Sequence, residues 1–186
     1  MERGRLVYVM GPSGAGKDSV IAFARAASDP ARVAFAHRYI TRPAVADAEN
    51  HVALTTAEFA ARLAAGWFVL HWESHGLHYG IGREVELWLG SGRSVVVNGS
   101  RAYLPEALRR YPGLLPVLVT APAEIRQARL AARRRASDGD LKARVARRVE
   151  LEEGCDAMVE IDNSAALPEA GAALLRLLDG ISRASP

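Results

Sequence analysis

The residues with the clearest chemical potential are Gly11–Lys17, which read Gly-Pro-Ser-Gly-Ala-Gly-Lys. They follow an apolar run at Arg5–Met10, which predicts a short buried strand, and they precede a helical pattern at Asp18–Ala27. Glycines let a backbone close around phosphate, amide groups at a helix start supply positive potential, and a lysine reaches the outer phosphates. The segment therefore predicts a site for ATP, formed by Gly11, Pro12, Ser13, Gly14, Ala15, Gly16, Lys17, Asp18 and Ser19.

Lysine usage supports this interpretation. The chain has two lysines, Lys17 and Lys142, and carries the rest of its basic charge on arginine. An ammonium group is a compact point charge, which differs from the planar fork of a guanidinium. A chain that otherwise avoids lysine keeps one where the loop requires it, and we predict a catalytic role for Lys17.

The position after this lysine departs from the usual pattern. A serine or threonine there normally holds Mg²⁺, but this chain has Asp18 followed by Ser19. The predicted strand Ser94–Asn98 also lacks the acidic residue that often supports the metal. Because a carboxylate is a good ligand for a hard cation, we predict that Asp18 binds Mg²⁺. The alternative is that Asp18 only interacts favourably with the helix N-terminus.

Strand and helix patterns alternate along the chain. Predicted strands lie at 5–10, 33–40, 67–74, 94–98, 115–120 and 157–161, and predicted helices at 18–27, 55–65, 83–89, 104–110, 122–135, 141–153 and 167–182. Residues 41–50 and 75–82 are predicted loops because of their polar, proline and glycine content. The alternation predicts an α/β fold with a mostly parallel sheet flanked by helices, and 41–82 reads as an antiparallel insertion.

Bulk properties narrow the function classes. The 186 residues predict one domain, with no apolar run long enough to span a membrane. A single cysteine, Cys155, rules out an internal disulfide and favours the cytoplasm. Net charge is +3, and the densest basic run, Arg133–Arg135, has no interleaved aromatic residue. We therefore expect a small anionic ligand as the partner, with no nucleic acid and no membrane; the oligomeric state stays open.

Several segments together resemble the guanylate-kinase-like group of P-loop kinases. They are the loop Gly11–Lys17, Thr41-Arg42-Pro43, the glycine- and tyrosine-containing turn Gly76–Gly80, and Arg129–Arg133 with the later Arg144. The resemblance implies a P-loop NTPase fold in which an insertion at about 41–82 binds the acceptor and a helical lid spans about 129–148, with a core of 1–40 and 83–186. It also implies that Arg133 and Arg144 act in catalysis together with Lys17.

The departures from this group concern the acceptor. The positions at which guanylate kinases read guanine are Leu70 and Arg38 here, and a second phosphate-binding arginine is replaced by Val45. The segments 16–19, 37–42, 49–51 and 97–101 more closely resemble the ribose 1,5-bisphosphate phosphokinase family of bacterial phosphonate degradation. That resemblance implies transfer of phosphate from ATP, with Mg²⁺, to ribose 1,5-bisphosphate, giving 5-phosphoribosyl diphosphate and ADP.

The same resemblance supplies candidate acceptor residues. They are Arg38, Arg42, His51, Tyr79, Asn98 and Arg101. Two other functions remain open at this point. One is a nucleoside monophosphate kinase with altered base preference, and the other is a catalytically inactive binding module, which the intact loop with Lys17 disfavours.

Overall fold

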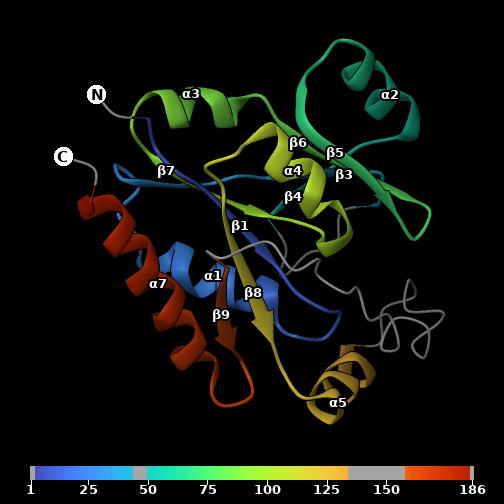
Figure 1. The fold of residues 1–186 in the computed structure, drawn as a ribbon. Coiled ribbons are helices and arrows are strands. Elements are labelled where there is room, and N and C mark those ends of the chain that lie inside the picture. The colour runs from blue at the N-terminus through green and yellow to red at the C-terminus, as the bar shows by residue number, and fades with distance from the viewer. Residues whose placement is uncertain (1–2, 44–49, 134–157, 185–186) are drawn as a thin grey trace.

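The structure is a computed structural model that describes residues 3–43, 50–133 and 158–184. Its strands form a five-stranded sheet in the order β2-β7-β1-β8-β9 and a four-stranded sheet in the order β4-β3-β6-β5 (Figure 1). The five-stranded sheet consists of β1 (Leu6–Met10), β2 (Val33–Phe35), β7 (Ser94–Asn98), β8 (Leu115–Thr120) and β9 (Val159–Asp162). Every pair in it is parallel, which confirms the predicted α/β fold.

Helices cover both faces of this sheet. Alternate residues of β1 point to opposite sides, so Val7 and Val9 belong to one buried cluster and Tyr8 and Met10 to another. The first cluster is closed by α1 (Lys17–Ala27) and α7 (Leu167–Ala184). The second is closed by α3 (Glu84–Gly90) and α4 (Leu104–Arg110), together with residues of the four-stranded sheet. A short η1 turn (Arg101–Tyr103) precedes α4, and α5 (Ala123–Arg133) follows β8.

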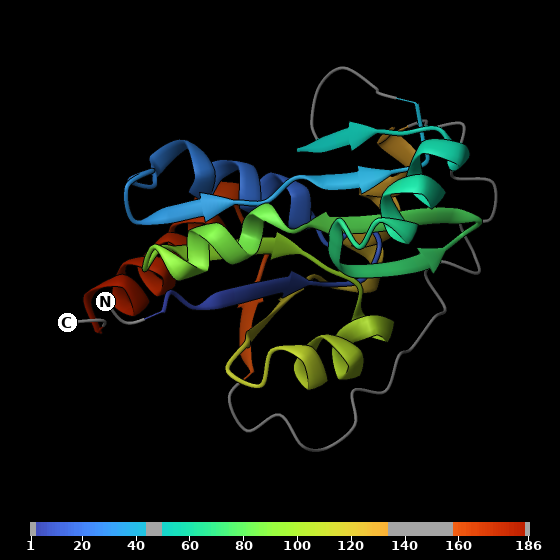
Figure 2. The same cartoon turned by 90° about the horizontal axis from the view of Figure 1, so that it is seen from above.

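The four-stranded sheet lies toward the end at which β1 points, as the view from above shows (Figure 2). It consists of β3 (Arg38–Ile40), β4 (His51–Ala53), β5 (Phe68–Ser74) and β6 (Leu77–Gly82). Its β5–β6 and β3–β6 pairs are antiparallel, but β3 and β4 are parallel. Within 41–82 the β5–β6 pair is antiparallel, as predicted. The sheet as a whole differs from the prediction, because it begins before residue 41 and its β3–β4 pair is parallel.

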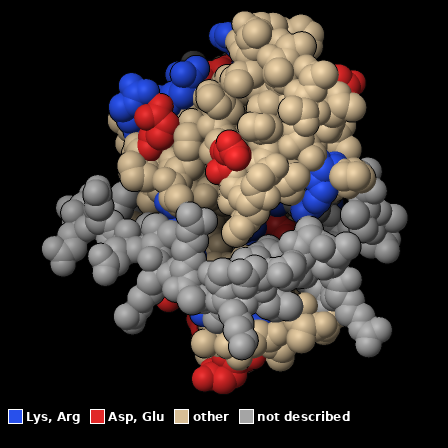
Figure 3. All heavy atoms as spheres, turned by 90° about the vertical axis from the view of Figure 1, so that its right-hand side faces the viewer, with Lys and Arg blue, Asp and Glu red and all other residues tan. Residues whose placement is uncertain are grey.

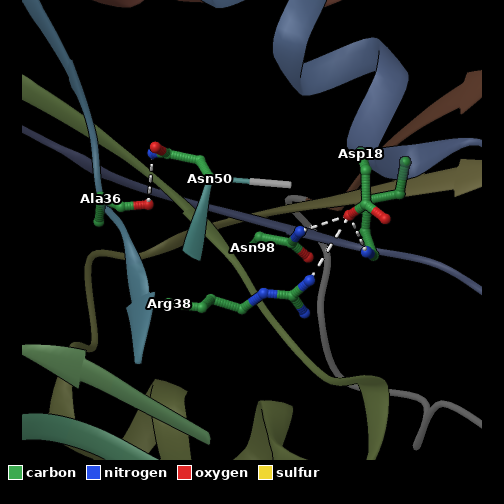
Figure 4. A network of polar contacts seen from close by, with 6 residues as sticks. Asp18, Ala36, Arg38, Asn50 and Asn98 are labelled. Atoms are coloured by element: carbon green, nitrogen blue, oxygen red, sulfur yellow. Dashed lines mark hydrogen bonds and ion pairs between the residues drawn. The ribbon is translucent and has the colours of Figure 1, made fainter. Parts of the chain in front are cut away.

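One predicted strand, 33–40, is two strands in different sheets. Ala36 still donates to Val96 of β7, but the chain then leaves that sheet and Arg38 enters the other one. The Asn50 side chain donates to the carbonyl groups of Phe35 and Ala36, both at 3.3 Å. Figure 4 shows the bond to Ala36. At the point where the chain changes sheets, these two carbonyl groups thus accept from a side chain. Such a tertiary contact cannot be predicted from a strand pattern.

The predicted loop at 75–82 is mostly strand β6. Only His75 and Gly76 form the turn, with positive φ of 54° and 69°, which suits a tight β-hairpin with glycine second. Gly80 lies within the strand. A glycine is needed at this position because a Cβ would come 2.7 Å from the Phe68 ring. One of the glycines that suggested a loop, Gly80, therefore reflects close packing between paired strands.

The strand β4 and the turn η1 were not predicted, and the remaining described helices and strands follow the predictions to within a few residues. The helix predicted at 55–65 is α2 (Thr56–Ala64), and Thr55 caps it in a capping box with Glu58. The helix predicted at 141–153, much of the lid at 129–148 and Cys155 lie outside the described residues. No helix in the described ranges is long and apolar enough to cross a membrane.

Candidate active site

The loop between β1 and α1 has the backbone shape of a phosphate-binding loop. Gly14 and Gly16 have φ values of 82° and 81°, in the left-handed region that disfavours residues with a Cβ. A Cβ at Gly11 would lie 2.3 Å from the carbonyl oxygen of Val119, and one at Gly14 would lie 2.6 Å from that of Arg126. The glycines are therefore required both by conformation and by packing, and the packing was not predicted.

Asn163, which was not predicted from the sequence, is a buried residue that contacts this loop from the end of β9. It follows β9, is 2% exposed, and donates through Nδ2 to the carbonyl oxygen of Ala15 at 2.8 Å. Its backbone N–H donates to Thr120 at the end of β8. The available signal was its place after a predicted strand, because the carboxyl ends of parallel strands meet at one edge of a sheet.

Asp18 is the centre of a polar network that joins the loop to both sheets (Figure 4). Its Oδ1 atom accepts a hydrogen bond from Asn98 Nδ2 at 2.6 Å and lies 3.2 Å from Lys17 Nζ. The Arg38 guanidinium of β3 lies 3.6 Å from the same oxygen. The structure thus brings together a loop lysine, a β7 asparagine and an arginine of the four-stranded sheet, all of which were predicted site residues.

The charges in this network decide the ionisation of Asp18. Burial by itself raises the pKa of a carboxyl group, but the charges of Lys17 and Arg38 and the hydrogen bond from Asn98 outweigh it. The pKa of Asp18 is consequently held well below its usual range. Burial also lowers the pKa of Arg38, a shift that Asp18 opposes. Asp18 is therefore an anion at neutral pH.

The donor set suits Mg²⁺ bound mainly through phosphates and water. The network contacts of Asp18 all fall on Oδ1. The ionised carboxylate thus offers Oδ2 as a ligand atom. Within the described ranges, His, Cys, Asp and Glu form no group of three that could hold a metal ion. Mg²⁺ commonly uses one or two carboxylates together with substrate phosphates, so a single carboxylate beside the loop fits that ion.

Other predicted acceptor residues surround Arg38. Its guanidinium lies 5.7 Å from the centre of the Tyr79 ring, and Tyr79 stacks on Trp72 at 5.4 Å with an interplanar angle of 2°. His51 of β4 is the strand partner of Arg38, and the charge of Arg42 acts on the pKa of Arg38. These contacts fix the Arg38 side chain on an aromatic surface next to the loop.

Arg101 and Leu70 are two further positions that the sequence singled out for the acceptor. Arg101 starts η1, three residues after Asn98, behind a turn in which Tyr8 and Ser100 exchange hydrogen bonds of 3.0 and 2.9 Å. Leu70, at the first position where guanylate kinases read guanine, is fully buried in the hydrophobic core. The polar group that reads a base is therefore absent from this position.

The side of the molecule at which β1 and β8 end is shown in Figure 3. Basic and acidic side chains are set back there between the upper and lower parts of the described surface. The side chain of Arg133 and all of Arg144, Val45 and Glu49 lie outside what the structure describes. The roles predicted for the two arginines stay predictions.

Comparison with solved structures gives the class of protein. A guanylate kinase from Anaplasma phagocytophilum aligns with a TM-score of 0.67 and 16% identity, over 97% of this chain and 87% of that one. At this identity the likeness concerns the fold, and together with the loop geometry it makes the chain a P-loop protein of the α/β class.

Curated relatives then give the family, although no family model matches the chain. "Ribose 1,5-bisphosphate phosphokinase PhnN" of Thiobacillus denitrificans is 54% identical over 96% of this chain and 94% of the relative. The protein of the same name from Desulfomicrobium baculatum is 55% identical over 94% of each chain, and that from Burkholderia mallei is 51% identical over 98% of this chain and 100% of the relative. The chain belongs to the ribose 1,5-bisphosphate phosphokinase family, and it is a kinase.

Proposed function

We propose that the chain transfers the γ-phosphoryl group of ATP to ribose 1,5-bisphosphate, giving 5-phosphoribosyl diphosphate and ADP. The observation that carries the proposal is the Asp18 network, in which Arg38 reaches the phosphate-binding loop from the four-stranded sheet. A guanidinium at this point suits a phosphorylated acceptor, because its planar fork matches phosphate oxygens. The names of the relatives support the same acceptor.

The nucleotide would be held by the loop. Backbone amides of Gly11–Gly16 and the start of α1 would contact the phosphates, and Lys17 would leave Asp18 to meet the outer phosphates. Asp18, with Ser19 beside it, would hold Mg²⁺, which when bound neutralises charge on the β- and γ-phosphates. Asn163 would keep the Ala15 carbonyl turned away from the nucleotide by holding it on the β9 side.

The acceptor would bind on the four-stranded sheet side. Arg38 and Arg42 would hold its phosphates, with His51 and Arg101 adding donors, and Tyr79 would form the wall on which Arg38 rests. Asn98 would orient both Asp18 and the acceptor. The number of basic side chains in this set matches the charge of a sugar bisphosphate better than that of a nucleoside monophosphate.

The chemistry needs no strong general base. An oxygen of the acceptor's C1 phosphate is already ionised at neutral pH and forms a bond to the γ-phosphorus. The bond from that phosphorus to the bridging oxygen breaks, and ADP leaves with the electron pair. Positioning and charge neutralisation therefore carry catalysis. We assign Arg133 and Arg144 to the charge of the transferring group, as the family resemblance implies.

An acceptor panel tests the proposal. Purified protein with ATP and Mg²⁺ is given ribose 1,5-bisphosphate, GMP or AMP, and products are followed by ³¹P NMR. We expect a new diphosphate signal from the sugar and no more than about 1% of that rate with either nucleotide, because the groups that read a base are absent. Efficient phosphorylation of GMP without turnover of the sugar would refute it, and loss of all transfer would favour a binding module.

A further inference from the structure

A second cleft lies at the end of the five-stranded sheet opposite to the phosphate-binding loop. It is lined by Arg3–Leu6 before and within β1, by Leu89 of α3, by Arg110 at the end of α4 with the following Tyr111–Leu114, and by Ile181 of α7. Leu6, which lines the cleft, and Gly11, which begins the loop, are five residues apart, or about 17 Å at the usual rise of a strand. None of the residues assigned to the proposed reaction lines it.

The size and lining of this cleft suit a small organic ligand. Its volume is about 470 Å³, within the range of small-molecule sites. Leu6, Leu89 and Leu114 are 1–4% exposed and give it an apolar wall that is continuous with the core. Arg3, Arg5 and Arg110 add a basic rim.

The three arginines of the rim differ in their ion-pair partners. Glu86 beside the cleft already accepts from Arg3 and, at 2.5 Å, from the Tyr111 hydroxyl. Among the described residues, neither Arg5 nor Arg110 forms an ion pair with a carboxylate, although the charge of Arg110 acts on nearby Glu106 and its side chain interacts with the Tyr111 hydroxyl. Arg5 is nonetheless fixed, because its Nε donates to the Gly113 carbonyl at 3.2 Å. Two guanidinium groups on one cleft can bind an acid group, since their N–H donors match its oxygens.

We propose that this cleft is a second ligand site, which takes a small amphipathic anion. The acid group, a phosphate, sulfonate or carboxylate, lies at Arg5 and Arg110. An apolar or planar body lies against Leu6, Leu89 and Pro112. The site is independent of the proposed reaction, so its failure leaves that function untouched.

The test uses 8-anilinonaphthalene-1-sulfonate, which combines a flat apolar body with one sulfonate. Its fluorescence is titrated with the full chain at saturating Mg²⁺ and a non-hydrolysable ATP analogue, which occupy the nucleotide site. Arg5→Gln and Arg110→Gln are each expected to weaken probe binding about tenfold, because each removes a charged hydrogen-bond donor. Binding should also weaken as salt is raised.

The matched control is Arg109→Gln. Arg109 precedes Arg110 on α4 but does not line the cleft, and its guanidinium is already held by Glu106 at 2.5 and 2.9 Å. This variant is expected to bind the probe within twofold of the unsubstituted chain. Near-ultraviolet circular dichroism and phosphoryl transfer, both unchanged, verify that the variants are folded. Equal probe binding by all three variants, or complete displacement of the probe by the ATP analogue alone, overturns the proposal.

Discussion

The phosphate-binding loop and the four-stranded sheet meet at Asp18, but they present different kinds of groups. The loop offers backbone amides, shaped by Gly14 and Gly16 in a conformation that other residues rarely adopt. The sheet offers side chains, above all Arg38 resting on Tyr79. A backbone site is defined by conformation and tolerates little change, whereas a side-chain site changes its ligand when one residue changes. The second kind of site is thus where members of one fold can come to differ in acceptor.

The largest effect is expected at Gly16, in the loop whose backbone we expect to bind the phosphates. Gly16→Ala places a Cβ 2.4 Å from Asn163 Nδ2 and forces a residue with a side chain into a left-handed conformation at φ 81°. We expect ATP affinity to fall at least about 100-fold by calorimetry, since the strain and the shifted loop together cost about 2–3 kcal/mol. The control is Gly180→Ala in α7, where a Cβ meets nothing within 4 Å and alanine favours the helix. ATP affinity equal in both variants would contradict the backbone argument.

The next effect tests the side-chain half of the comparison. Arg38→Ala should raise the acceptor KM about 10- to 100-fold in initial-rate kinetics, because charged hydrogen bonds are worth about 1.5–3 kcal/mol each. The ATP KM should change less than threefold. Arg38→Lys should recover part of the loss, since it keeps the charge but not the planar fork.

Arg62→Ala is the matched control for this prediction. Arg62 lies on α2, over the rings of Tyr39 and Trp67 at 5.4 and 5.7 Å, outside the proposed acceptor set. Its removal should leave both KM values within twofold. If Arg38→Ala raises the ATP KM and leaves that of the acceptor unchanged, Arg38 belongs to the nucleotide site.

These two halves also differ in how far the sequence could predict them. The strand at Arg5–Met10, the loop at Gly11–Lys17 and the helix at Asp18–Ala27 are adjacent in sequence, so all three could be predicted from local patterns. The four-stranded sheet depends on pairings between distant segments, such as Arg38 with Ile81 and with His51. The hairpin at His75–Gly76 was not predicted, because a glycine that packs closely within β6, such as Gly80, resembles a loop glycine in sequence. Asn163 was missed because its hydrogen bond to Ala15 spans 148 positions.

A smaller effect is expected at Asp18, which both halves share. Asp18→Asn keeps the shape and removes the charge that we assign to Mg²⁺. The Mg²⁺ concentration for half-maximal activity should rise about tenfold, while ATP binding without metal stays equal or improves because a repulsive charge is gone. An unchanged Mg²⁺ dependence would leave Asp18 as a residue of the helix start, with Ser19 or Glu49 as the better metal candidate.

The same variant makes a prediction about pH. The pKa of Asp18 is lower in the folded chain than its ordinary value near 4, so its charge stabilises the fold above that value. The contribution is lost as the pH falls below about 4, where the unfolded chain binds the proton first. The free energy of unfolding, measured by urea titration from pH 6 to pH 3, should therefore decrease less steeply for Asp18→Asn than for the unsubstituted chain.

The smallest effect is expected at the start of α2, which lies next to the four-stranded sheet and outside the Asp18 network. The Thr55 hydroxyl accepts from the Glu58 N–H at 3.1 Å, and the Glu58 carboxylate accepts from the Thr55 N–H at 2.8 Å. Thr55→Ala removes the first of these bonds and should reduce the free energy of unfolding by about 1 kcal/mol. Because α2 supplies no residue to the proposed site, kcat and both KM values should stay within twofold at 25 °C. Thr56→Ala is the matched control, since Thr56 is the first helical residue and not the cap. A loss of activity in Thr55→Ala that exceeds its loss of stability would mean that α2 positions the acceptor residues, and the separation between scaffold and site would then fail.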